Sequence, residues 1–391
     1  MKVAEASANF PPYFGGIGNT CFHNAAELAN LGHEVTVFSS KTGNEEYHYP
    51  ENMSVRLSRP LFRYGNAVFL PELLNIKGFD AVHVHMPFHF GAEMLFFSSK
   101  ANRIPLIATY QMDLVGEGWL KHFFRLHRET VVKPLLRRAS RVIVSSMDYA
   151  ENSDISGILK KREGSLFELP NGVDVGKFNP KVKALKLRRK LGLEKDKVVL
   201  FVGALDKSHY FKGVENLVKA FAAVKKHEAK LVIVGEGNLK QYYMEKAAKH
   251  GVGSYMEKAA KHGVGSRTIF AGRVEDEELP QYYALSDFLV LPSTDKAEAF
   301  GLVAVEAMAS GKAVIASNLP GVRKNVEEGK TGLLVEPNNV KGLSGAINYL
   351  VENESTAKRM GINGRRKAEE AFDWKKIGAK LEKIISGVLG E

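Results

Sequence analysis

Short apolar runs alternate with helix-like segments along almost the whole chain. The runs at 198–203, 230–235 and 288–292 are rich in Val, Leu and Ile, and each leads through a loop into a helical pattern. Strands buried in a parallel sheet read as near-continuous apolar runs, and parallel strands need a crossover connection that is usually a helix. The alternation therefore predicts an α/β protein built on parallel sheets.

A basic segment poor in apolar residues, 177–190, interrupts this alternation. The chain has 391 residues, and a single hydrophobic core seldom grows beyond about 250–300 residues. We therefore expect two domains, 1–178 and 179–371. The amphipathic pattern of the tail predicts a last helix within 372–391.

The composition restricts the class of protein. With 45% apolar and 25% charged residues, the chain has the balance of a soluble globular protein. Its net charge of +11 favours anionic partners such as nucleoside diphosphates, anionic lipid surfaces or nucleic acid. The single cysteine, Cys21, excludes an internal disulfide and fits a reducing compartment. Residues 1–8 are too polar for a signal peptide and no long apolar stretch follows, so we expect a cytoplasmic protein.

One stretch, 297–311, combines an apolar helix with two carboxylates. It reads as a helix from about Ala299 and ends at Gly311, a residue suited to the left-handed position after a helix end. A helix that is apolar all round is buried, and a carboxylate within it, here Glu306, needs partners. Glu298 lies ahead of the helix start, where free amides and the helix dipole favour anions. The stretch is either an anion cradle with a second carboxylate about two turns inside, or a capped helix with a buried ion pair.

A glycine-rich turn, 10–19, joins the first strand-like run to a helical pattern. It contains Gly15, Gly16 and Gly18 in the order Gly-Gly-x-Gly, which differs from the dinucleotide-binding fingerprint. Such a turn suggests a backbone that approaches a phosphate, although glycine-rich turns are more often simply tight turns.

Polar residues gather where other strand-like runs end. His83 and His85 end one run, and Gln111 and Asp113 end another. Ligands of open α/β sheets bind beside the carboxyl ends of the strands. Alternation sends both histidines to the same side, but no cysteine or carboxylate completes a ligand set there. We therefore prefer a histidine that faces a cleft to a metal site.

Two lysines, Lys207 and Lys212, lie in the loop after the run 198–203. Solvated lysines are the usual case, but two in one loop at the carboxyl end of a strand can hold phosphates. They are the candidate cations of the second domain.

The segment 119–138 is basic, aromatic and helical in pattern. One interpretation is docking on an anionic membrane face, which would place the protein peripherally on the inner side of a membrane. The other is an ordinary amphipathic helix on a basic protein.

A unit of twelve residues, 243–254, is repeated without change as 255–266. This unit is too short for a solenoid repeat. We expect a local duplication that is functionally neutral.

Together these motifs resemble those of the retaining nucleotide-sugar glycosyltransferases of family four. The resemblance covers essentially the whole chain, and its most specific part is the Glu-x7-Glu pair at Glu298 and Glu306. It implies the GT-B fold, in which two Rossmann-like domains face each other across a deep cleft and a C-terminal helix crosses back to the N-terminal domain. The other matching motifs are Pro-Pro-Tyr-Phe-Gly-Gly-Ile-Gly at 11–18, Asp-Ala-Val-His-Val-His at 80–85, Pro-Asn-Gly-Val-Asp at 170–174, Phe-Lys-Gly at 211–213, Val-Gly-Glu-Gly at 234–237 and Phe-Asp-Trp at 372–374.

The resemblance also implies an activity and a set of site residues. A sugar would move from a nucleoside-diphosphate-sugar to a sugar or lipid-linked acceptor with retention of configuration, without a cofactor or a metal. The implied catalytic residues are Glu298, Lys212, Lys207 and Gln111; those that bind the donor are Gly15, Gly16, Gly203, Val274, Phe300, Gly301, Leu302, Val303 and Glu306; those on the acceptor side are His85 and Asp113.

Two positions depart from the family pattern. The family usually has an arginine where this chain has Ala204, and Lys207 of the same loop can replace its charge. Family members often have a histidine where Gln111 stands, and an amide can bind a sugar hydroxyl but cannot take a proton.

Three functions therefore remain open. A glycosyltransferase is favoured; the alternatives are a catalytically weak or inactive nucleotide-sugar-binding protein of the same fold, and a GT-B epimerase or phosphorylase. The dispersed basic charge and the lack of a recognised motif argue against nucleic acid as a partner.

Overall fold

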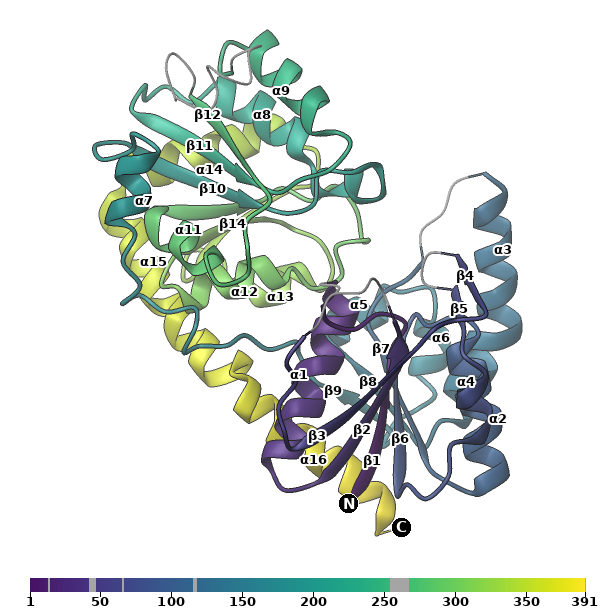
Figure 1. Cartoon of the computed structure of the whole chain (residues 1–391). Coiled ribbons are helices and arrows are strands. Elements are labelled where there is room, and N and C mark those ends of the chain that lie inside the picture. The colour runs from purple at the N-terminus through teal and green to yellow at the C-terminus, as the bar shows by residue number, and fades with distance from the viewer. Residues whose placement is uncertain (13–14, 42–46, 65–66, 115–117, 254–266, 391) are drawn as a thin grey trace. The chain divides into compact units, whose positions relative to one another are not determined.

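The computed structural model divides the chain into two compact units, shown in Figure 1. It describes residues 1–12, 15–41, 47–64, 67–114, 118–253 and 267–390, without the side chains of residues 119 and 120. Unit 1 consists of Met1–Gly172 and Trp374–Glu391, and unit 2 of Val173–Asp373. The division lies a few residues before the boundary expected from the sequence at 178/179. The second copy of the duplication, 255–266, falls outside the described residues.

The described residues of unit 1 form a seven-stranded parallel sheet in the order β3-β2-β1-β6-β7-β8-β9. Its strands are β1 (Lys2–Ala6), β2 (Glu34–Ser40), β3 (Met53–Ser58), β6 (Ala81–Met86), β7 (Leu106–Tyr110), β8 (Arg141–Val144) and β9 (Leu166–Glu168). A short antiparallel pair, β4 (Phe62–Tyr64) and β5 (Ala67–Phe69), lies outside it. The parallel pairing confirms the α/β prediction.

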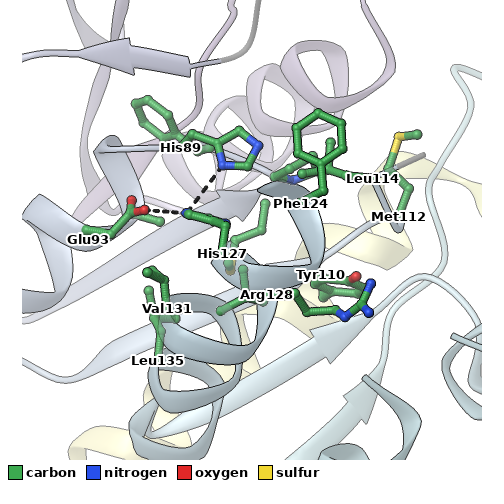
Figure 2. A pocket seen from close by; sticks show the side chains of 15 residues that line it. His89, Glu93, Tyr110, Met112, Leu114, Phe124, His127, Arg128, Val131 and Leu135 are labelled. Carbon is green, nitrogen blue, oxygen red and sulfur yellow. Dashed lines mark hydrogen bonds and ion pairs between the residues drawn. The ribbon is translucent and has the colours of Figure 1, made fainter. Parts of the chain in front are cut away.

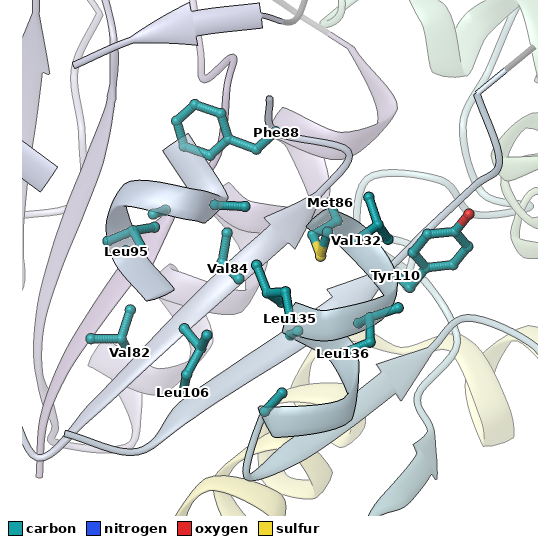
Figure 3. Packing of buried hydrophobic residues seen from close by; sticks show 14 of the residues in the cluster. Val82, Val84, Met86, Phe88, Leu95, Leu106, Tyr110, Val132, Leu135 and Leu136 are labelled. Carbon is teal, nitrogen blue, oxygen red and sulfur yellow. The ribbon is translucent and has the colours of Figure 1, made fainter. Parts of the chain in front are cut away.

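Helices cover both faces of this sheet (Figure 1). They are α1 (Gly16–Asn30), η1 (Pro71–Asn75), α2 (Gly91–Asn102), α3 (Trp119–His127), η2 (Arg128–Val132), α4 (Lys133–Arg138), α5 (Met147–Glu151), α6 (Ser156–Leu159) and α16 (Trp374–Leu389). On one face, alternation along β6 sends Val82, Val84 and Met86 into a core shared with Leu95 of α2 and Leu135 of α4, as Figure 3 shows. The segment 119–138 is helical throughout, as its pattern predicted.

The last helix of the chain, α16, closes the other face of the unit 1 sheet. Its side chains Ile377, Leu381 and Ile385 are buried with residues of α1 and β1, and each contributes roughly 1.5–3 kcal/mol by leaving water. The ring of Trp374 stacks on His23 of α1 at 4.6 Å. The backbones approach so closely that a Cβ at Gly378 would lie 2.4 Å from the Cβ of Glu27. The tail is therefore an integral part of unit 1.

The described residues of unit 2 form a six-stranded parallel sheet in the order β12-β11-β10-β13-β14-β15. The strands are β10 (Lys197–Val202), β11 (Ala229–Val234), β12 (Thr268–Gly272), β13 (Phe288–Leu291), β14 (Ala313–Ser317) and β15 (Gly332–Val335). The helices are α7 (Leu185–Lys190), η3 (Lys207–Lys212), α8 (Val214–Ala222), α9 (Lys240–Lys249), α11 (Leu279–Leu285), α12 (Leu302–Ala309), α13 (Val322–Asn325), α14 (Val340–Glu352), α15 (Glu354–Lys367) and η4 (Ala368–Phe372). One core lies on each face of the sheet.

The helices in the described part of the chain were also compared with the length and hydropathy of a membrane span. None of them is long and apolar enough to cross a bilayer.

Each of the two units is built as a parallel sheet between layers of helices, and polar loops follow the carboxyl ends of its strands.

Candidate functional site

The N-terminus of α12 is the centre of the candidate site in unit 2. The helix begins at Leu302, three residues later than the sequence predicted, because Gly301 adopts a left-handed conformation with φ 78°. The side chain of Asn325 donates a hydrogen bond to the carbonyl of Phe300 at 2.5 Å and holds the preceding turn out of the helix. Glu306 consequently lies little more than one turn inside the helix, and the expected two turns are wrong. Gly311 is left-handed as predicted, with φ 72°.

An ion pair stands in front of this helix. The Lys212 ammonium donates to Oε2 of Glu298 at 2.6 Å, and the Ser293 hydroxyl donates to the same oxygen at 3.1 Å. The side chains of Lys212 and Glu298 are only 15% and 9% exposed. Lys212 ends η3 after β10, and Glu298 belongs to the loop after β13, so adjacent strands of the sheet deliver the two groups. The structure thus brings together two residues that the sequence singled out.

Glu306 is held by a residue that sequence reasoning missed. Its Oε2 accepts a hydrogen bond of 2.5 Å from the hydroxyl of Tyr283, a fully buried residue of α11. Burial raises the pKa of Glu306, and the negative charge of Asp276 adds to this effect, whereas the Tyr283 hydroxyl and nearby lysines oppose it. The Glu306 residue is itself only half-buried, so part of it stays accessible. No sequence signal distinguishes Tyr283 from its neighbour Tyr282.

The remaining donor-side candidates of unit 2 lie at different distances from this centre. Gly203 follows β10, and a Cβ on it would lie 3.5 Å from Cδ of Lys212. Val274 lies in the loop after β12, where it packs half-buried against the core. Lys207 is exposed at the start of η3, and within the described part of the chain it contacts neither Lys212 nor Glu298. The structure therefore places one of the two predicted lysines at the centre.

The glycine-rich turn of unit 1 leads directly into α1. Gly15 is the residue before the helix and Gly16 is its first residue. The hydroxyl of Thr20, one turn into the helix, donates to the carbonyl of Gly16 at 2.9 Å. At Gly18 the backbone passes so near Asn9 that a Cβ would lie 2.6 Å from its carbonyl oxygen. Close packing against the backbone of Asn9 therefore requires glycine at position 18.

A chain of buried hydrogen bonds crosses the middle of the unit 1 sheet. Glu5 of β1 contacts Nδ1 of His83 at 2.9 Å through one oxygen and Nε2 of His85 at 2.8 Å through the other. His83 Nε2 lies 2.6 Å from the hydroxyl of Thr109, and His85 Nδ1 lies 3.3 Å from the amide nitrogen of Gln111. Both histidines are fully buried, so the expectation of a histidine that faces a cleft is wrong. They lie on the same side of the sheet, as predicted.

The sequence argument against a metal ligand set assumed that no carboxylate lies near the two histidines, and the position of Glu5 shows that this assumption is wrong. One ligand atom each of Glu5, Cys21 and His85 lies within 4.8 Å of the others. Both oxygens of Glu5 are nevertheless engaged by imidazoles. Burial opposes the ionisation of Glu5, but the two histidines outweigh it and lower its pKa. Burial raises the pKa of the Cys21 thiol well above its ordinary value, so it resists becoming a metal-binding thiolate.

The same chain of buried hydrogen bonds orients Gln111. Burial, together with the charge of His83, lowers the pKa of His85 and favours its neutral form. A neutral His85 that donates Nε2–H to Glu5 must accept at Nδ1, so the proton assignment makes Gln111 the donor there. This leaves the Gln111 amide oxygen as the group that can meet a ligand.

Asp113, the other predicted acceptor-side residue, is buried and has structural partners. Its carboxylate accepts a hydrogen bond from the Tyr110 hydroxyl at 2.6 Å and from the backbone of Asp154 at 3.1 Å. Its own backbone N–H donates to the Tyr149 hydroxyl at 2.8 Å. These bonds tie together the loops at the carboxyl ends of β7 and β8.

Comparison with known proteins gives matches over both units. Residues 14–177 match the family model described as Glycosyltransferase Family 4, and residues 184–367 match the one described as Glycosyl transferases group 1. An uncharacterized glycosyltransferase of Methanocaldococcus jannaschii is 26% identical, over 98% of this chain and 97% of its own length. A GDP-mannose-dependent alpha-(1-6)-phosphatidylinositol monomannoside mannosyltransferase of Mycolicibacterium smegmatis is 27% identical, over 97% of each chain.

A solved structure shares the fold. The Anabaena protein HepE, crystallised in complex with UDP, superimposes with a TM-score of 0.74 at 21% identity, over 99% of this chain and 100% of that one. At that identity the likeness extends to the fold and not to the ligand.

Proposed function

The chain belongs to the group 1 glycosyltransferases with the GT-B fold, and from that membership we propose that it transfers a sugar from a nucleoside-diphosphate-sugar to an acceptor hydroxyl with retention of configuration. The observation that carries the proposal is the Lys212–Glu298 pair in front of the N-terminus of α12. Unit 2 would bind the donor and unit 1 the acceptor. The names of the Mycolicibacterium smegmatis relative and of the Anabaena complex both contain a nucleoside diphosphate, which supports this class of donor.

The geometry suits the charge that develops in such a reaction. When the bond between the sugar and the diphosphate breaks, negative charge grows on the departing phosphate. Lys212 and the free amides at residues 300–303 are positive groups fixed in place before the reaction. They would stabilise the leaving group without a metal. The accessible part of Glu306 would accept hydrogen bonds from the ribose hydroxyls while Tyr283 holds its other oxygen.

Glu298 would position the donor sugar and would not attack it. Its Oε2 already accepts from Lys212 and Ser293, which reduces the nucleophilicity of the carboxylate and fixes its direction. The acceptor oxygen would then bond to the anomeric carbon on the face that the phosphate leaves. Its proton would pass to the departing phosphate oxygen, and the products would be the glycoside and the nucleoside diphosphate. The oriented amide of Gln111 would bind a sugar hydroxyl during this step.

The first experiment is a thermal-shift panel of nucleotide sugars, followed by transfer assays with those that stabilise the protein. Lys212→Met should lower turnover by about 10²–10³-fold, as removal of one stabilising group at a developing charge does. Glu298→Gln should also lower turnover, because the amide no longer pairs with Lys212 or positions the donor sugar as the carboxylate does. Lys358→Met, which removes a 72% exposed lysine of α15, is the control and should leave turnover unchanged. Excess chelator should also leave it unchanged. Equal activity of the Lys212→Met and Lys358→Met proteins would contradict the proposal.

A second function has one observation in its favour. Ala204 removes the cation that the family usually has, and the exposed Lys207 contacts neither Lys212 nor Glu298 in the described part of the chain. A protein that binds the nucleotide sugar without transferring the sugar would fit this reduced charge. Donor binding without turnover on a broad acceptor panel would favour this second function. Formation of an epimer or a sugar phosphate would favour the epimerase or phosphorylase alternative, and nuclear magnetic resonance of the product would also report retention.

A further inference from the structure

The first residues of unit 2 form a tight turn, 174–178, which we call the entry segment. The side chain of Asp174 organises it, because Oδ1 accepts hydrogen bonds of 2.8 Å from the backbone N–H groups of Gly176 and Lys177. The carbonyl of Asp174 accepts a third bond, from the N–H of Phe178 at 2.9 Å. These bonds give the entry segment a defined conformation before the first strand of unit 2 begins.

Arg365 of α15 fastens the entry segment to the donor-site helix α12. Its Nη1 donates hydrogen bonds to the carbonyl oxygens of Val175, Phe178 and Ala309, at 3.0, 2.8 and 2.7 Å. Ala309 is the last residue of α12, where free carbonyls and the helix dipole favour a cation. The entry segment is therefore held against the same helix whose opposite end provides the amides of the donor site.

Phe178 connects the entry segment with Glu306 through an aromatic contact. Its ring meets the ring of Tyr283 edge to face, with centroids 5.5 Å apart and an interplanar angle of 84°. Both rings are buried, so close packing fixes their positions. The hydroxyl of Tyr283 in turn holds Oε2 of Glu306 at 2.5 Å. The position of the Glu306 carboxylate thus depends on Phe178.

Lys177 connects the entry segment with the charges around Glu306. Its ammonium pairs with Oδ2 of Asp276, in the loop that follows β12, and the two side chains are 27% and 46% exposed. Burial is the largest influence on the pKa of Glu306 and raises it, and the Tyr283 hydroxyl opposes this. The charge of Asp276 also raises that pKa, whereas the charges of Lys177 and of Lys212 in η3 lower it. Both members of the Lys177–Asp276 pair therefore act on the carboxylate.

The ionised form of Glu306 is the one that suits a ribose. An ionised carboxylate only accepts hydrogen bonds, so it can receive them from neighbouring hydroxyl groups, whereas a protonated carboxyl group presents one oxygen as a donor. Burial by itself favours the protonated form, and an unpaired carboxylate nearby would favour it further. A fixed cation beside Asp276 works against both effects.

We propose that the entry segment is part of the donor site, and that Phe178 and Lys177 are positioning residues for Glu306. Phe178 fixes the place of the carboxylate through Tyr283, and Lys177 keeps the carboxylate ionised by neutralising Asp276. Arg365 holds both in place through the backbone of the segment. The inference rests on the proposed function, because it takes Glu306 as the group that binds the ribose.

The Lys177–Asp276 pair is tested by titrating UDP, GDP and ADP into the full chain at a series of pH values, with isothermal titration calorimetry. The quantity compared is the pH at which half of the affinity is lost on acidification. Lys177→Met leaves Asp276 without its cation, so the pKa of Glu306 should rise and this pH should rise with it. Asp276→Asn removes the opposing charge, so the pH of half-loss should fall. The double variant should lie between the two single variants.

A matched control for the charge comes from the same stretch of chain. Lys181→Met removes an exposed lysine four residues beyond Lys177, and it should leave the pH of half-loss unchanged. The same pH of half-loss in Lys177→Met, Asp276→Asn and the unmodified protein would overturn the role of the pair. Shifts of the two single variants in the same direction would overturn it as well.

The aromatic contact is tested by Phe178→Leu, with Phe221→Leu as its control. Phe221 lies in α8 and is fully buried in the core on the other face of the unit 2 sheet, so its loss lowers stability without touching Tyr283. Both variants should lower the melting temperature. Nucleotide affinity near neutral pH should fall about two- to tenfold in Phe178→Leu alone, the factor that an aromatic pair contributes beyond its buried area. Equal affinity in the two variants would overturn the positioning role of Phe178.

The outcomes separate this inference from the proposed function. Nucleotide binding by the unmodified protein, with the pH of half-loss unmoved in the charge variants and affinity unmoved in Phe178→Leu, leaves the proposed function standing and refutes only the role of the entry segment. Failure of the unmodified protein to bind any of the three nucleotides refutes the proposed function, and this inference falls with it. Opposite shifts in Lys177→Met and Asp276→Asn are the result that supports it.

Discussion

The turn between η3 and α8 allows backbone strain to be separated from crowding at the donor site. Gly213 has φ 70°, and a Cβ on it would lie 2.1 Å from the carbonyl oxygen of Pro292. Gly329 has φ 71° and nothing within 4 Å of the corresponding point. Both glycines belong to unit 2, so Gly329→Ala is a matched control for Gly213→Ala.

The expected costs follow from these two environments. Alanine in the left-handed region costs roughly 1–2 kcal/mol, and both variants bear this cost. Gly213→Ala must also relieve the contact with Pro292, and forced overpacking adds typically about 1–3 kcal/mol. At about 2–4 °C per kcal/mol for a unit of this size, the melting temperature of unit 2 should fall by about 10 °C in Gly213→Ala and about 4 °C in Gly329→Ala.

The site should respond as well as the stability. Gly213 directly follows Lys212, so the shift that relieves the contact moves the ammonium away from Glu298. We expect nucleotide affinity to fall about tenfold in Gly213→Ala, the effect of weakening one charge-assisted hydrogen bond, and to stay unchanged in Gly329→Ala. Differential scanning calorimetry and isothermal titration with the stabilising nucleotide measure the two effects. Equal melting temperatures for the two variants, or unaltered affinity in Gly213→Ala, would refute the reasoning.

Three further predictions concern titratable and hydrogen-bonding groups. Tyr283→Phe removes a hydrogen bond that favours ionised Glu306, so the already raised pKa of Glu306 should rise further. On acidification, nucleotide affinity should then be lost at a higher pH than in the unmodified protein. Nucleotide titrations at a series of pH values measure this, and loss of affinity at the same pH in both proteins would contradict it. The pKa of Glu5 is lowered in the folded state, so its ionised form contributes stability above its unfolded-state pKa, and this stability is lost as the pH falls through the folded value. Glu5→Gln should therefore lower the melting temperature near neutral pH and make it depend less on pH under acidic conditions. The same acid dependence of the melting temperature in both proteins would count against the buried network. Gln111→His should keep or raise turnover because an imidazole can also donate to Nδ1 of His85, and a large drop in the transfer assay would show that the amide itself is required.

The architecture was predictable from the sequence because its signal is local. Strands buried on both faces, such as β10 and β13, are apolar without interruption, and the loops that follow them carry the lysine and the carboxylate of the donor site. The late start of α12 was not predictable, since it depends on the left-handed Gly301 and on Asn325 from a later helix. Local pattern cannot report a hydrogen bond from a residue that lies further along the chain.

The buried polar groups were missed for a related reason. Glu5 meets His83 because β1 pairs with β6 in a register that places these two residues side by side. Their separation along the chain gives no hint of that register. His89, in the loop before α2, and Glu93 of α2 likewise meet His127 of α3, which lies far from both along the chain (Figure 2). Long-range pairing decides these sites, and composition and periodicity do not encode it.

The membership of α16 in unit 1 has a consequence for the order of folding on the ribosome. All residues of unit 2 precede Trp374, so unit 2 can fold while the last helix is still being made or is still inside the exit tunnel. Until that helix emerges, the apolar side chains of α1 that face it, such as Ala25 and Leu28, lack their cover. The first unit to begin is thus the last to be completed, which reverses the usual N-terminal-first order of synthesis and folding. A chain that stops short of Trp374 would keep a complete second unit and expose an unfinished first one.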